Sequence, residues 1–208
     1  MNLFLDAANI NCWADLASTR LFSGITTNPL LIQQAGLKAS IETYRILYDR
    51  ATKLGYQCIQ FQVFGEDWLQ CARSIASIGP EMFIKIPANK IGFEVVSKLN
   101  LPDRTTLTAV YSVGQVIAAE AQKIAYTAPY YARLRDAIEN ADGLFDRMQD
   151  VAIETKLLVA SLQSNAQFLD LATRGFSTFA LPEPIARAFF ESTLADKSIA
   201  DFEDAARS

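Results

Sequence analysis

The sequence predicts an α/β fold, a (β/α)8 barrel that forms a single domain over residues 1–208 and carries an extra helix at its C-terminal end. Short apolar runs alternate with longer helical patterns about eight times along the chain, and strands joined by crossover helices must lie parallel. A doubly wound open sheet is the weaker alternative, because Asp6-Ala7-Ala8-Asn9 follows the first run where that fold has a Gly-rich turn.

The expected elements follow in chain order. The candidate strands are Leu3–Leu5, Gly24–Thr26, Cys58–Val63, Met82–Ile86, Thr105–Val110, Ile124–Ala128, Leu157–Ser161 and Ser177–Leu181. Helical patterns lie between them, such as Ile41–Leu54 and Val113–Gln122. Two helices are expected over residues 182–208, and the last, over 193–208, carries a thin apolar stripe. This stripe contains Leu194, Ile199 and Phe202, and it can pack on its own barrel or on a neighbouring subunit.

Composition excludes several classes of function. The chain contains no histidine, which excludes Ser-His-Asp hydrolysis, His-zinc sites and imidazole pH switches. With a net charge of -4 and no dense Lys/Arg cluster, we expect no nucleic-acid partner. The apolar stretches are too short to span a membrane, and the N-terminal residues do not resemble a signal peptide. The three cysteines lack a disulfide spacing, so we expect a cytoplasmic protein.

Polar residues interrupt or follow the apolar runs, and the strand ends of a parallel barrel are where its sites form. Lys85 is the most informative of them. Strand alternation sends Phe83 and Lys85 to one face, so the ammonium group can point into the barrel. Burial lowers the pKa of a lysine, and the neutral amine can condense with a ketone. The alternative is a lysine that reaches solvent or pairs with Asp6.

Several of these runs resemble the successive motifs of the small transaldolase family, particularly its fructose-6-phosphate aldolase branch. The resemblance rests on Leu3-Phe4-Leu5-Asp6, Gly24-Ile25-Thr26-Thr27-Asn28-Pro29, Ile84-Lys85-Ile86-Pro87, Thr108-Ala109-Val110-Tyr111, and Ala128-Pro129-Tyr130 with Arg133. It extends in order from the first strand to Ser161. It implies a class I, Schiff-base barrel enzyme that needs no cofactor or metal.

The resemblance also implies roles for individual residues. Lys85 would form the Schiff base, and Asp6 would hold a substrate hydroxyl and influence the protonation of Lys85. Thr26 and Asn28 would bind substrate hydroxyls. For these three polar residues the alternatives are a helix cap for Asp6 and turn chemistry for Thr26 and Asn28.

A catalytic water would lie near the imine, held by Thr108 and Gln62. Gln60 shares the strand face of Gln62, and the residues alone do not separate them, although the pair Gln62-Val63 matches the family pattern better. In transaldolases the residue that corresponds to Gln62 looks like Glu, and Phe usually takes the place of Tyr130. The aldolase branch resembles this chain in having an amide at the position of Gln62. An amide cannot titrate usefully, so the proton transfer would pass to the phenol of Tyr130. Its alternative is a core aromatic.

The resemblance gives Arg133 and Ser161 as the phosphate-binding residues. Gln163 stands where the family usually has a basic residue, which suggests weaker phosphate affinity. The expected function is reversible cleavage of fructose 6-phosphate, or a related ketose phosphate, into dihydroxyacetone and glyceraldehyde 3-phosphate. A transaldolase and a non-catalytic sugar-binding barrel are the alternatives. A sugar phosphate is the expected partner, together with other copies of the chain, since the family forms pentamers and decamers.

Overall fold

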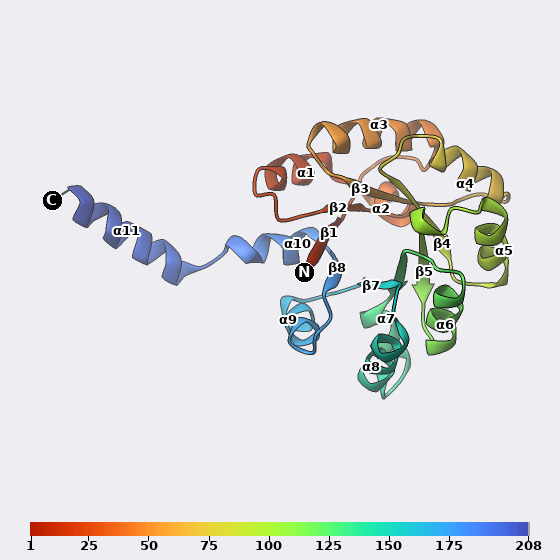
Figure 1. Ribbon diagram of the computed structural model, residues 1–208. Helices are drawn as coiled ribbons and strands as arrows, with labels where there is room; N and C mark the ends of the chain where they lie inside the picture. Colours follow the sequence, from red (N-terminus) through yellow and green to blue (C-terminus); the bar gives the residue numbers. More distant parts are fainter. Residues whose placement is uncertain (208) are drawn as a thin grey trace.

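The eight strands form one closed parallel barrel in the order β1-β2-β3-β4-β5-β6-β7-β8, which confirms the predicted fold (Figure 1). The computed structural model describes residues 1–207. The strands are β1 (Asn2–Asp6), β2 (Gly24–Thr26), β3 (Cys58–Gln62), β4 (Met82–Pro87), β5 (Thr105–Val110), β6 (Tyr126–Pro129), β7 (Lys156–Val159) and β8 (Thr178–Leu181). The last strand pairs with the first, with Leu5 opposite Leu181.

Helices follow every strand. They are α1 (Ile10–Ala17), α2 (Pro29–Gln34), α3 (Ile41–Lys53), α4 (Trp68–Ala76), α5 (Lys90–Leu99), α6 (Val113–Ala121), α7 (Tyr131–Ala137), α8 (Ala141–Val151), α9 (Asn165–Thr173), α10 (Glu183–Arg187) and α11 (Thr193–Arg207), with short 3-10 turns at Pro102–Arg104 and Ala188–Phe190. Asn and Ser side chains accept hydrogen bonds from the first-turn amides of many of these helices. Among them are Asn9, Asn28, Asn89, Ser112 and Ser164, which explains why each helix begins directly after its loop.

Two apolar layers hold the barrel together. The larger lies between the sheet and the helices and includes Trp13, Tyr44 and Phe61, none of which is exposed to solvent. The smaller fills the inside of the barrel around Phe4 and Tyr126. Gly24 allows the close approach of β2 to β3, because a Cβ there would overlap the carbonyl oxygen of Cys58.

Two predicted strands differ from the observed ones by two residues at one end, and the others by one residue or none at either end. The sixth begins at Tyr126 and not at Ile124, because the Ile124 amide bonds to the Ala119 carbonyl at the end of α6. The seventh ends at Val159 and not at Ser161, whose backbone is left-handed with φ 59°. The C-terminal helix, expected over 193–208, is present as α11, and residue 208 lies outside the described residues.

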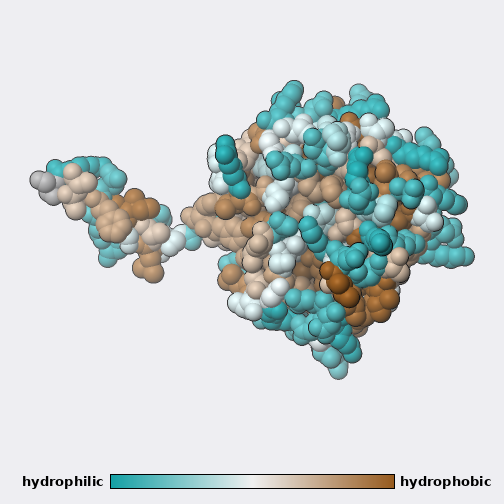
Figure 2. Space-filling model, in the orientation of Figure 1, coloured by the Kyte–Doolittle hydropathy of each residue, from teal (hydrophilic) through white to brown (hydrophobic). Residues whose placement is uncertain are grey.

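Helix α11 projects away from the barrel (Figure 1). None of its residues is buried, and Leu194, Ile199 and Phe202 are 78%, 57% and 71% exposed. Figure 2 shows apolar residues along this projecting arm. No helix within residues 1–207 is both long enough and apolar enough to cross a membrane.

Candidate active site

The carboxyl ends of the strands bring the predicted polar residues to one end of the barrel. Asp6 pairs in register with Thr26, and Gln62 pairs with Lys85. Phe83 packs in the barrel interior, whereas Ile84 and Ile86 belong to the layer beneath the helices. The predicted orientation of Lys85 toward the interior is thus confirmed.

Lys85 is buried beside one hydroxyl and one carboxyl group. Its side chain is 2% exposed, and its Nζ donates to Thr26 Oγ1 at 2.5 Å. Lys85 therefore does not reach solvent. Burial lowers the pKa of Lys85, and the charge of Asp6 opposes that shift only in part. A buried amine with a lowered pKa has the chemistry of a nucleophile toward carbonyl carbon.

Asp6 is a buried acidic residue near the amine of Lys85. Its Oδ1 atom is buried without a hydrogen-bond partner among residues 1–207, and burial raises its pKa while the charge of Lys85 opposes the rise. Asn9, and not Asp6, caps α1. The carboxyl group is therefore left to interact with a ligand or with Lys85, and a groove of about 890 Å³ opens beside it between the β1–α1 loop, α2 and α10.

A second polar pair is formed by Tyr130 and Thr108. Their hydroxyl oxygens share a hydrogen bond of 2.8 Å, and both residues are buried. Burial raises the pKa of Tyr130, and the bond to Thr108 opposes this, so the phenol is protonated at neutral pH. Ala109 is left-handed with φ 55° at a bulge between Thr108 and Val110, which ends the regular pairing of β5 with β6 just after Thr108.

The two glutamines of β3 occupy different depths. Gln60 is fully buried, and its Oε1 accepts from the Thr106 hydroxyl at 3.0 Å. Gln62 is half-buried and pairs with Lys85 at the carboxyl end, while its backbone carbonyl accepts from the Tyr44 phenol at 2.9 Å. The geometry thus favours Gln62 as the amide at the site, which the residues alone had left open. Thr106 was missed, although its position two residues before Thr108 on the same strand face was a usable signal.

The remaining predicted residues lie around the rim. Asn28 Oδ1 accepts from the Leu30 and Leu31 amides at 2.9 and 3.1 Å, so its carbonyl caps α2, as the turn alternative expects. Arg133 is exposed on α7, with its guanidinium carbon 5.2 Å from the Tyr130 ring centroid. The Ser161 carbonyl accepts from the Ala132 amide at 3.1 Å, which joins the end of β7 to the same helix.

Gln163 is exposed and its amide donates to Gln167 Oε1 at 2.8 Å. Across residues 1–207, no group of three or more Cys, Asp or Glu side chains is arranged to hold a metal ion. The arrangement therefore offers a buried amine, a carboxyl group, a phenol, amides and one exposed guanidinium group near a common mouth.

Comparison with known proteins gives a consistent result. A family model described as "Transaldolase/Fructose-6-phosphate aldolase" matches residues 3–207. A protein of Methanococcus maripaludis named "Probable transaldolase" is 27% identical over 97% of this chain and 95% of its own length. One of the same name from Dehalococcoides mccartyi is 28% identical over 97% of this chain and 96% of its own length.

Solved structures match in fold. The dihydrodipicolinate synthase of Rhodopseudomonas palustris has a TM-score of 0.58 and 12% identity, covering 88% of this chain and 69% of that chain. The citrate synthase SbnG has a TM-score of 0.59 and 10% identity, covering 100% and 94%. At such identities the likeness concerns the barrel alone.

Proposed function

Because the chain belongs to the transaldolase/fructose-6-phosphate aldolase family, we propose that it is a class I aldolase that cleaves fructose 6-phosphate, or a closely related ketose phosphate, reversibly. The products are dihydroxyacetone and glyceraldehyde 3-phosphate. The observation that carries the proposal is the burial of Lys85 Nζ in the barrel, bonded to Thr26 and beside the carboxyl group of Asp6.

The reaction follows from the chemistry of these groups. The neutral amine of Lys85 adds to the C2 carbonyl of the ketose, and loss of water gives a protonated imine. The C3–C4 bond then breaks, its electron pair moves toward the imine to form an enamine, and the C4 hydroxyl proton passes to water. Protonation of C3 and hydrolysis of the imine release dihydroxyacetone and restore the amine.

Proton transfer is assigned to a water held by Tyr130, Thr108 and Gln62. The phenol is protonated and hydrogen-bonded to Thr108, so it can donate to that water when C3 takes a proton. Gln62 cannot titrate, and it therefore orients the water without exchanging protons with it. Asp6 and Thr26 flank Lys85 and hold hydroxyl groups of the ketose, and the amide nitrogen of Asn28 assists them.

Two other functions are kept as alternatives. Transfer of the dihydroxyacetone unit between sugar phosphates is favoured by the names of the relatives from M. maripaludis and D. mccartyi. The occurrence of Gln62 together with Tyr130 in one chain favours cleavage, because the proton-exchanging group is then a phenol and not a carboxylate. The second alternative is a non-catalytic sugar-binding barrel. The burial of Lys85 and its lowered pKa argue against this alternative.

Covalent trapping tests the proposal directly. The protein is incubated with dihydroxyacetone and sodium borohydride, and the adduct is mapped by mass spectrometry. We expect the adduct on Lys85 and its loss in Lys85→Met. Lys156→Met is the matched control, because Lys156 is exposed at the opposite end of the barrel at the start of β7. Free dihydroxyacetone released from fructose 6-phosphate without an acceptor distinguishes cleavage from transfer.

The acceptor phosphate is assigned to Arg133 and Ser161. Arg133 is exposed beside Tyr130, and Ser161 lies at the adjoining strand end. Gln163 contributes no positive charge, so the preference for a phosphorylated aldehyde is expected to be small. Comparing kcat/KM for phosphorylated and unphosphorylated acceptors measures it, and a large preference for the phosphate counts against a weakened site.

We further propose that the chain forms a homo-oligomer and works in the cytoplasm. The apolar stripe on the projecting helix α11 supports the first, since exposed apolar residues of this kind gain by packing on a neighbouring copy (Figure 2). The free thiols of Cys12, Cys58 and Cys71 support the second. Light scattering after size-exclusion chromatography tests the assembly. We expect Phe202→Glu to lower the molecular mass, whereas Asp201→Asn on the same helix leaves it unchanged.

A further inference from the structure

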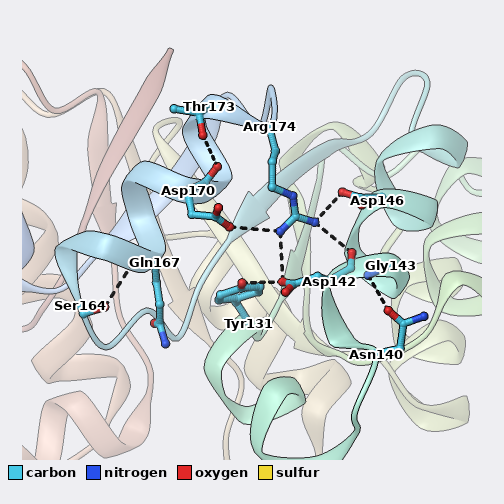
Figure 3. A network of polar contacts seen from close by, with 10 residues as sticks. All are labelled: Tyr131, Asn140, Asp142, Gly143, Asp146, Ser164, Gln167, Asp170, Thr173 and Arg174. Atoms are coloured by element: carbon cyan, nitrogen blue, oxygen red, sulfur yellow. Dashed lines mark hydrogen bonds and ion pairs between the residues drawn. The ribbon is translucent and has the colours of Figure 1, made fainter.

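An arginine at the end of α9 joins three acidic residues of two helices (Figure 3). Arg174 Nη1 lies 3.1 Å from Asp142 Oδ1 and 3.3 Å from Asp170 Oδ2, and Nη2 lies 2.5 Å from Asp146 Oδ1. Nη2 also donates to the Asp142 carbonyl oxygen at 2.9 Å. The arginine side chain is 22% exposed. This fork fixes the first turn of α8 against the end of α9.

One of the three carboxylates continues the network into α7. The Tyr131 phenol donates to Asp142 Oδ1 at 2.6 Å (Figure 3). Tyr131 is buried, and its ring packs edge-on against Phe145, with ring centroids 4.9 Å apart. The hydrogen bond from Tyr131, together with Arg174, holds the pKa of Asp142 below its usual range, so the carboxylate is charged at neutral pH. Tyr131 is thus held both by its ring and by its hydroxyl group.

Tyr131 directly follows Tyr130, the proposed proton-transfer residue. Tyr130 occupies the N-cap position of α7, but its side chain makes no capping bond, and its phenol is hydrogen-bonded to Thr108. The helix is therefore held by other contacts. The Tyr131 amide donates to the Ala160 carbonyl at 3.0 Å, and the phenol of the same residue reaches Asp142.

We propose that Arg174, Asp142 and Tyr131 form a positioning network that holds the first turn of α7, and with it the Tyr130 phenol, in place for proton transfer. The inference rests on the proposed function. Tyr131 and Arg174 act through Tyr130 and do not touch substrate. An error of about 1 Å in the place of a reacting group costs up to about a hundredfold in rate, so a partial release of α7 is expected to have a measurable effect.

Tyr131→Phe tests the network with little change in packing, because the ring against Phe145 is kept. The readout is the exchange of carbon-bound hydrogens of dihydroxyacetone in D2O, followed by proton NMR. In this exchange the Lys85 imine loses a proton from carbon to the held water, and the enamine takes a deuteron back. We expect exchange to fall about tenfold. Borohydride trapping on Lys85 is expected to change by less than about twofold, since it needs the amine but not the phenol.

Asp146→Asn is the matched control. It removes the ion pair between Arg174 and Asp146, which lies on α8 like Asp142, and it leaves the bond between Tyr131 and Asp142 in place. We expect the melting temperature to fall while exchange stays within about twofold of wild type. Arg174→Met should lower exchange as Tyr131→Phe does, and the double variant should be little worse than either single variant.

The outcomes of these experiments distinguish a failure of the positioning network from a failure of the proposed function. Unchanged exchange in Tyr131→Phe, with normal trapping, would overturn the network and leave the proposed function intact. An equal loss in Asp146→Asn would also overturn it, because the effect would then follow stability alone. Absent trapping in the wild-type protein would refute the proposed function itself, and with it the reason for positioning Tyr130.

Discussion

The hydrogen bond between Tyr130 and Thr108 gives a prediction with a defined magnitude. Its oxygens lie 2.8 Å apart, Tyr130 is 9% exposed and Thr108 is not exposed. Tyr130→Phe leaves the Thr108 hydroxyl buried without this partner, and Thr108→Val does the same to the phenol. Each single change is expected to lower the free energy of unfolding by about 1–3 kcal/mol.

The double variant is expected to behave differently. Phe and Val keep the shapes of Tyr and Thr, and no buried hydroxyl of the pair then remains. Replacing both partners of a hydrogen bond by apolar groups is nearly neutral, so the double variant should be more stable than either single variant. The interaction energy of the cycle is then about 2 kcal/mol or more.

Urea unfolding at one fixed protein concentration measures these free energies, with the fluorescence of the two tryptophans, Trp13 and Trp68, as the probe. Tyr44→Phe combined with Thr108→Val serves as the control cycle, because the Tyr44 phenol bonds to the Gln62 carbonyl and not to Thr108. That cycle should be additive. If the losses in the Tyr130 and Thr108 variants also add, the two hydroxyls are not coupled, and the argument for a positioned phenol fails.

Three further predictions concern single positions. Gln62→Glu should raise transfer relative to cleavage when both products are quantified, and an unchanged ratio would refute the assignment to the cleaving branch. Lys85→Met should gain stability relative to wild type as pH falls, because the lowered pKa of Lys85 means that the unfolded chain binds the extra proton, whereas the loss of the bond to Thr26 costs the same at every pH. The gain should grow as pH falls below 10.5, by up to about 1.4 kcal/mol per pH unit, until it levels off below the lowered pKa; a gain that shrinks there would contradict the reasoning. Ala109→Gly should preserve stability to about 1 kcal/mol, whereas Ala109→Val should lose more at φ 55°, as thermal melting would record.

Local regularities made most of the barrel predictable. The two-residue period of a strand was enough to direct Lys85 inward, because it depends on backbone geometry alone. Strand ends were less predictable. The true start of the sixth strand depends on the Ile124 amide, which is taken by the Ala119 carbonyl, and the apolar character of Ile124 does not reveal this.

Features that depend on the relation between distant elements could not be predicted. Gln60 and Gln62 lie on one strand face, and only the stagger of β3 against β4 and β5 shows that Gln60 bonds to Thr106 deep in the barrel. The meeting of Arg174 with Asp142 likewise joins residues 32 positions apart on different helices. Charged residues on helix surfaces give no sign in the sequence of which partner they will meet.

The projecting α11 has a consequence for how its own secondary structure is maintained. A helix of 15 residues is close to the length at which an isolated helix is marginal in water, and most helical stability in proteins comes from a covered apolar face. This arm has no such cover on its own barrel (Figure 1). On the proposed packing of α11 against a neighbouring copy, its backbone amides should exchange rapidly in dilute solution and slowly at high protein concentration, while those of the barrel strands exchange slowly at both. Amide exchange in α11 would thus report how far the protein has self-associated at a given concentration.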